Sequence, residues 1–178
     1  MGAWGPGLYS DDVTEDVRGI YVDKLHRGKN GEQASKEMIA EFEWAWSDED
    51  DAPVFWFAMA DMQWNYGRLQ EEVKKKALYY LNDMKNLQRW EYENLKMSEK
   101  RKQVLNELRK KLNTLQPSEK KVSQYRLYHC QWKVGDMYAY QLEGEYAKER
   151  GLNGKYLLFY KIAESIWWPG HVIPVVYI

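Results

Sequence analysis

The chain holds few residues that could act as nucleophiles or general bases. It has one cysteine, Cys130, and three histidines, His26, His129 and His171. A cysteine nucleophile needs an imidazole within reach, but His129 and Cys130 are adjacent in a segment expected to be extended, where successive side chains point to opposite faces. Cys130 could still meet His171 through the fold, although a lone strand cysteine is more often a small core residue. We therefore predict a protein without enzymatic activity.

Signatures of cofactor and metal sites are missing as well. The sequence has no glycine-rich phosphate loop, no Gly-x-Ser-x-Gly turn and no paired cysteines for zinc. The acidic run at residues 48–51 lacks the alternating ligands, central glycine and distal glutamate of a calcium loop. Because Pro53 follows it, the run is better explained as the start of a helix. We expect no cofactor and no metal.

Charge is distributed unevenly along the chain, although the net charge is only −1. Residues 1–68 carry 14 acidic and 6 basic side chains, whereas residues 69–130 carry 8 acidic and 15 basic ones. Such polarity indicates either two opposed partner surfaces or, as we favour, two halves that attract each other in the fold. The basic helix at 98–116 could follow a phosphate backbone, and ring-rich small barrels can stack bases. The pI of about 6.3 argues against this nucleic-acid alternative.

Aromatic residues are abundant, with nine tryptophans and fourteen tyrosines. Large rings in loops are typical anchors of protein interfaces, which singles out Trp4, Trp167 and Trp168. Pro169 and Gly170 predict a type II turn after the tryptophan pair, and His171 begins the last strand. We take these residues, together with Asp136 in the Gly135-Asp136 turn, as the candidate binding site. The competing interpretation is that the rings are internal plugs, which we favour for Trp4.

The periodicity of apolar residues predicts helices in the first two thirds of the chain. Ser10 is expected to cap a helix that ends before Gly28, and a second helix should span 32–46. Residues 54–64 are apolar nearly all round, which indicates a buried central helix. A fourth helix is expected at 70–82, a short stretch around 84–90, and a basic helix that begins at Ser98 and ends before Pro117.

After Pro117 the pattern changes to short strands. They are expected at 125–132, 137–142, 155–162 and 172–178, with a charged excursion at 143–153. We predict an α+β fold: a helical domain at 1–116, a linker at 117–124, and a small antiparallel β domain at 125–178 shaped as an SH3-like barrel. A lone cysteine, no secretion signal and no long apolar run predict a cytoplasmic protein that does not enter membranes. The oligomeric state stays open.

Two stretches resemble an uncharacterised bacterial family whose members open with Met-Gly-x-Trp-Gly-x-Gly. The first is Met1 to Asp16, and the second runs from Ala52-Pro53-Val54-Phe55-Trp56 to Gln63-Trp64. Gly135-Asp136-x-x-Ala139-x-x-Leu142, with the later Gly154-Lys155-Tyr156, is similar to small β-barrel immunity proteins of bacterial toxin systems. The resemblance implies no reaction. The sequence therefore favours a non-enzymatic, intracellular protein-interaction module, of the immunity or inhibitor kind, with a protein partner ahead of nucleic acid.

Overall fold

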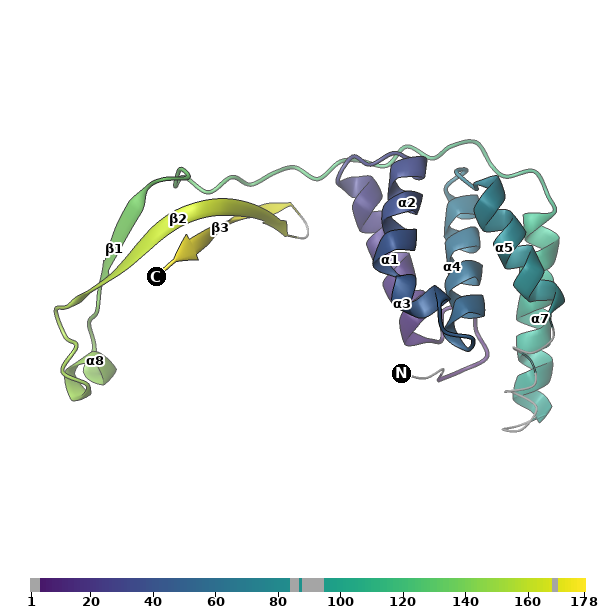
Figure 1. Cartoon of the computed structure of the whole chain (residues 1–178), viewed down its shortest axis with the longest axis horizontal. Coiled ribbons are helices and arrows are strands. Elements are labelled where there is room, and N and C mark those ends of the chain that lie inside the picture. The colour runs from purple at the N-terminus through teal and green to yellow at the C-terminus, as the bar shows by residue number, and fades with distance from the viewer. Residues whose placement is uncertain (1–3, 84–86, 88–94, 168–169) are drawn as a thin grey trace. The chain divides into compact units, whose positions relative to one another are not determined.

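The computed structural model describes residues 4–83, 87, 95–167 and 170–178. The chain divides into two compact units, Met1–Gln124 and Tyr125–Ile178. The first is built of helices and the second of an antiparallel sheet (Figure 1). The architecture is therefore α+β, with the helices preceding a small antiparallel sheet.

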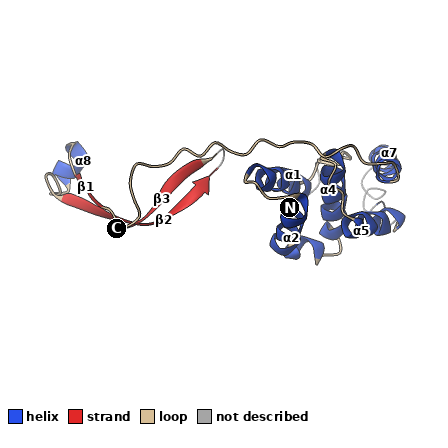
Figure 2. Ribbon diagram, turned by 90° about the horizontal axis from the view of Figure 1, so that it is seen from above, coloured by secondary structure: helices blue, strands red, loops and turns tan. Residues whose placement is uncertain are grey.

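The helical unit is organised around one central helix. Its helices are α1 (Asp12–His26), α2 (Gly31–Glu41), α3 (Glu43–Trp46), α4 (Asp51–Asn65), α5 (Glu71–Asn82) and α7 (Leu95–Leu112). Figure 2 shows α4 between α1 and α2 on one side and α5 and α7 on the other. Every residue of α4 from Ala52 to Gln63 is buried, as expected for a helix that is apolar all round. The prediction of a buried central helix is confirmed.

Three details of the helices differ from the sequence-based expectation. Asp11, not Ser10, caps α1, because its carboxylate accepts a hydrogen bond from the backbone N–H of Val13. The expected second helix is divided at Phe42 into α2 and α3. Ser98 lies inside α7, which is helical from Leu95, so it is not the cap of that helix. Most of the stretch predicted around 84–90 lies outside the described residues.

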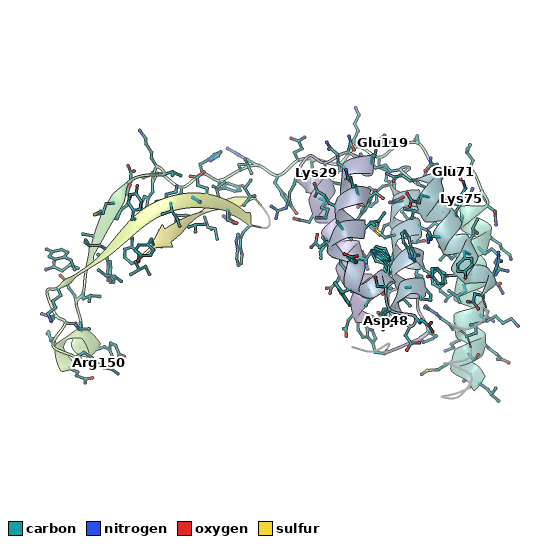
Figure 3. The ribbon with its side chains drawn as sticks, viewed as in Figure 1. Lys29, Asp48, Glu71, Lys75, Glu119 and Arg150 are labelled. Atoms are coloured by element: carbon teal, nitrogen blue, oxygen red, sulfur yellow. The ribbon has the colours of Figure 1, made fainter. Side chains whose placement is uncertain are left out.

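The segment at 117–124, predicted as a linker, lies along the helical unit. The backbone N–H of Lys120 donates to the carbonyl of Tyr66 at 3.0 Å, and Arg68 donates to the carbonyl of Lys120 at 3.1 Å. Arg68 also forms an ion pair of 2.9 Å with Glu119, a residue labelled in Figure 3. His26 Nδ1 lies 2.6 Å from the carbonyl oxygen of Ser123. The segment is therefore held by specific hydrogen bonds.

The second unit is a three-stranded antiparallel sheet in the order β1-β2-β3. Its elements are β1 (Met137–Gln141), α8 (Glu145–Glu149), β2 (Tyr156–Trp167) and β3 (His171–Tyr177). The short helix α8 lies in the connection between β1 and β2, near Arg150 in Figure 3. The strand expected at 125–132 is not formed. Within this range only Tyr128 takes part in β pairing, through an isolated bridge to His171. The described strands form an open sheet, so the closed barrel stays a prediction.

None of the helices in the described part of the chain combines the length and the apolar character needed to cross a bilayer.

Candidate interaction surface

The two units differ in how much of their apolar surface they bury. The core of the helical unit includes fully buried large side chains such as Tyr21, Phe55 and Phe57. In the sheet unit, the buried members of the described residues are only Ala147, Lys161, Gly170 and Val172. The sheet therefore presents most of its large apolar side chains at its surface. Exposed apolar surface of this extent marks a candidate binding site.

The strand register shows which side chains share a face. Directly paired residues project to the same side of a sheet. The register between β2 and β3 shifts by one residue at a bulge between Lys161 and Ala163, so Tyr160 and Ala163 project to the same side. One face, here called the open face, contains no lysine, arginine, aspartate or glutamate. Its residues are Met137, Ala139, Gln141, Tyr156, Leu158, Tyr160, Ala163, Ser165, Trp167, His171, Ile173, Val175 and Tyr177.

The opposite face of the sheet is partly covered by the chain that precedes β1. The Trp132 ring stacks on Tyr138 with 3.9 Å between ring centroids and 12° between planes. Lys161 is fully buried there, and its ammonium group donates to the carbonyl of Trp132 and, at 2.6 Å, to Glu164. A cavity of about 520 Å³ remains on this face, and its lining includes Trp132, Tyr138, Tyr140, Leu157 and Phe159.

The turn between β2 and β3 brings two of the predicted site residues together. Trp167, whose side chain is 63% exposed, pairs across the hairpin with His171. The His171 ring stacks on Tyr128, with 5.4 Å between centroids and 27° between planes. Trp167, His171 and Tyr128 therefore form one row, here called the ring cluster, at one end of the open face. Trp168 lies outside the described residues. The predicted type II turn depends on residues 168–169 and therefore stays a prediction.

Gly170 allows the chain before the sheet to reach the ring cluster. Its φ is +117°, a left-handed conformation that favours glycine, and a Cβ there would lie 2.7 Å from the carbonyl oxygen of Arg126. This close approach sets the two hydrogen bonds of 3.0 Å by which Tyr128 joins the backbone of Gly170 and Val172. A glycine in the turn thus positions the Tyr128 ring against His171.

Asp136 serves the turn in which it stands. Its carboxylate accepts hydrogen bonds from the backbone N–H of Lys133 at 2.8 Å and from the hydroxyl of Tyr138 at 3.0 Å. These two donors hold the pKa of Asp136 below its usual value. Partial burial, and then the hydrogen bond to Asp136, raise the pKa of Tyr138. The carboxylate predicted to contact a partner is therefore engaged in stabilising the start of β1.

Trp4 belongs to the helical unit, not to the sheet. Its backbone N–H donates to the carbonyl of Ser10 at 3.0 Å, while its side chain is 59% exposed. The interpretation of Trp4 as a core plug is therefore wrong. The reason is that the glycine-rich opening turns back on itself at Ser10 and leaves the ring outside the core.

The basic helix α7 uses several of its cations inside the helical unit. Arg101 is buried and donates to the carbonyl of Gly7 at 2.9 Å, and Arg109 donates to the carbonyl of Leu81. Lys111 forms an ion pair of 2.5 Å with Asp61. These three cations of the basic helix therefore have partners inside the helical unit. The lysines of α7 that stay exposed include Lys100, Lys102 and Lys110.

Sequence reasoning missed Tyr128 and Arg126. The Arg126 guanidinium lies 6.0 Å from the centroid of the Tyr128 ring, on a segment that the sequence assigned to a regular strand. The sequence signal at 156–160 did not distinguish the open face, because all five positions carry large apolar side chains. In the described part of the chain, no group of three or more histidine, cysteine, aspartate or glutamate side chains is placed to hold a metal ion.

Comparisons with known proteins add no assignment, because no family model, no curated protein and no solved structure matches this chain.

Proposed function

We propose that this chain is a non-enzymatic, intracellular protein-interaction module of the immunity or inhibitor class, and that the ring cluster is its partner-binding site. The observation that carries the proposal is the row of exposed rings, Tyr128, His171 and Trp167, on a sheet unit that buries few of its apolar side chains. The class within interaction proteins rests on the resemblance of the Gly135-Asp136 region to small immunity proteins.

The physical chemistry of the ring cluster suits recognition of a protein. Tyr128 and His171 are stacked, and Trp167 pairs with His171 across a hairpin, so the backbone under the rings is already ordered. Docking onto ordered rings costs less conformational entropy than docking onto flexible side chains. Aromatic side chains of this kind carry much of the binding energy of protein interfaces. We infer a partner that packs an apolar group against the exposed rings.

The proposal includes an SH3-like arrangement of the sheet unit. The 12-residue β2 carries a bulge between Lys161 and Ala163, and bulges of this kind bend and twist a strand as a small barrel requires. In such an arrangement β2 contributes to both halves of the barrel. The bulge lies between the half of β2 that pairs with β1 and the half that pairs with the start of β3. This position supports the proposal, because a strand shared by both halves of a barrel must bend at such a point.

Capture from extracts of the native host tests the proposal. The full-length protein is immobilised beside a Trp167→Ala variant and a Tyr146→Ala control. Tyr146 is 67% exposed and lies on α8 of the same unit, away from the paired strands. We expect Trp167→Ala to lower partner capture by about tenfold or more, as for an interface anchor, and the control to leave it unchanged.

The immunity class has its own readout. The captured protein, expressed in a sensitive host, should slow growth, and co-expression of this chain should restore growth while Trp167→Ala should not. Equal capture by all three immobilised proteins would reject the ring cluster as the binding site. A harmless captured partner would reject the immunity assignment and leave a general interaction module.

A further inference from the structure

We propose that a second copy of this chain covers the open face at its β1 end, so that the protein is a homodimer of stacked sheets. Met137, Tyr160 and Tyr177 pair across all three strands in one row. Leu158 and Tyr156 continue the same face beside β1. The five side chains are between 43 and 71% exposed, and no described residue of the sheet unit covers them.

The exposed area is sufficient for a stable dimer. A large side chain such as tyrosine offers roughly 150–250 Å² for burial, so five large side chains at these exposures offer about 450–700 Å² per copy. Two copies would bury about 900–1,400 Å² in total, which reaches the lower end of the range of specific protein interfaces. A soluble monomer rarely leaves an apolar patch of this size uncovered.

The chemistry of the open face favours a second copy over a charged partner. A two-fold dimer brings the same patch of two copies together, so a charge near the two-fold axis would face a like charge. The open face has no lysine, arginine, aspartate or glutamate, and it therefore meets itself without repulsion. Two antiparallel sheets stack about 10 Å apart with interleaved side chains, and tyrosine hydroxyls at the rim keep contact with water.

The proposed dimer contact and the ring cluster occupy different parts of the sheet. Tyr160 and Trp167 stand seven residues apart on β2, which corresponds to roughly 23 Å of extended strand. The bulge between Lys161 and Ala163 lies between them. The dimer therefore goes beyond the proposed function, because a partner can bind the ring cluster while the β1 end of the sheet is covered.

Light scattering coupled to size-exclusion chromatography tests the dimer on the full-length protein at micromolar concentrations. We expect twice the 21.3 kDa mass of one chain. Tyr156→Lys should raise the dimer dissociation constant by about tenfold or more, since it places two lysines in an apolar contact. Tyr140→Lys is the matched control, because both tyrosines are 61% exposed and stand on opposite faces of neighbouring strands.

Circular dichroism of each variant verifies that the fold is retained, and Leu158→Lys provides a second substitution at the centre of the patch. A single-chain mass over the whole concentration range would overturn the proposal. The same conclusion would follow if Tyr140→Lys dissociated the dimer as strongly as Tyr156→Lys and Leu158→Lys.

Discussion

At the scale of single residues, the buried carboxylate of Asp61 holds three segments of the helical unit together. It accepts hydrogen bonds from the hydroxyl of Tyr9 at 2.8 Å, from Asn65 at 2.8 Å and from Lys111 at 2.5 Å. Gln63, two residues further along α4, donates to the Ser35 hydroxyl and accepts from the backbone N–H of Gln70. Both polar side chains of the buried helix α4 therefore have hydrogen-bond partners on other segments of the helical unit.

Two tyrosines of the helical unit, the partly buried Tyr9 and the fully buried Tyr21, should respond differently to loss of the hydroxyl. Tyr9→Phe removes a hydrogen bond to a charged acceptor and should lower the free energy of unfolding by about 1–2 kcal/mol. The Tyr21 hydroxyl is buried without a hydrogen-bond partner among the described residues, and burial raises its pKa to about 12. Tyr21→Phe should therefore leave stability unchanged or increase it by up to about 1 kcal/mol. Urea unfolding measures both, and an equal loss in the two variants would contradict the assignment.

The turn before β1 should show a pH signature from Asp136. Its pKa is lowered in the folded state, so the stabilisation is present above the ordinary aspartate pKa and is lost as the pH falls through the folded value. We expect Asp136→Asn to lower the melting temperature at neutral pH and the difference from the unmodified protein to shrink in acid. A difference that stays constant with pH would show that the charge of Asp136 does not contribute.

At the scale of elements, the inward cations of α7 determine where that helix packs. Lys111 is 25% exposed and its partner Asp61 only 9%, so the pair is largely removed from water. Removing one member of such a pair leaves the other charge uncompensated. Arg101 and Arg109 act similarly on backbone carbonyls of the segment at Gly7 and of α5.

Neighbouring lysines of α7 therefore form a matched pair for a test. Lys111→Met should lower the free energy of unfolding by about 2–3 kcal/mol, because Asp61 loses its cation. Lys110→Met, on the exposed side, should change it by less than about 0.5 kcal/mol. Chemical unfolding followed by circular dichroism distinguishes the two. Similar losses would mean that Lys111 stabilises α7 only as a helix former.

The β2–β3 hairpin offers a second element-scale test, at its glycine. Gly170→Ala should strain the left-handed backbone and force the new Cβ against Arg126, with a cost of about 2 kcal/mol or more. Gly135 also has a positive φ, but a Cβ added there has no neighbour within 4 Å. Gly135→Ala should therefore lower the free energy of unfolding only by the backbone strain of about 1 kcal/mol. Hydrogen exchange of the β2 and β3 amides should accelerate more in the first variant. Equal acceleration would argue against a close contact at the turn.

At the scale of the whole molecule, the charge distribution bears on the nucleic-acid alternative. Arg101, Arg109 and Lys111 are engaged inside the helical unit, so the surface of α7 carries fewer available cations than its sequence indicates. Affinity for a phosphate backbone scales with the number of cations that displace counterions. Because these three cations are not available to phosphate groups, the basic helix is less suited to bind nucleic acid than its sequence indicates.

We therefore expect the full-length protein to bind duplex and single-stranded nucleic acid only weakly at physiological salt. Fluorescence anisotropy over a range of salt concentrations measures both the affinity and its salt dependence. A sub-micromolar, sequence-dependent interaction, lost when Lys100 and Lys102 are changed to Glu, would restore nucleic-acid binding as the leading function.

The sequence by itself determined where most of the regular elements lie. The run of apolar residues at 54–64 predicted α4, and the aromatic and aliphatic runs at 137–142 and 155–162 predicted β1 and most of β2. These signals are local, since helix and strand periodicity depend on residues a few positions apart. The predicted helix boundaries were wrong where the capping side chain was one of several neighbouring polar residues. An example is the start of α1, where Asp11 accepts the capping hydrogen bond.

Only the tertiary structure decided which of these residues could form a binding surface. The open face follows from the register of three strands, and the ring cluster from the bridge between Tyr128 and His171. The pairing of Lys111 with Asp61 joins residues 50 positions apart in the chain. No local pattern encodes such contacts, because whether a cation faces water or a carboxylate depends on which helix packs against it.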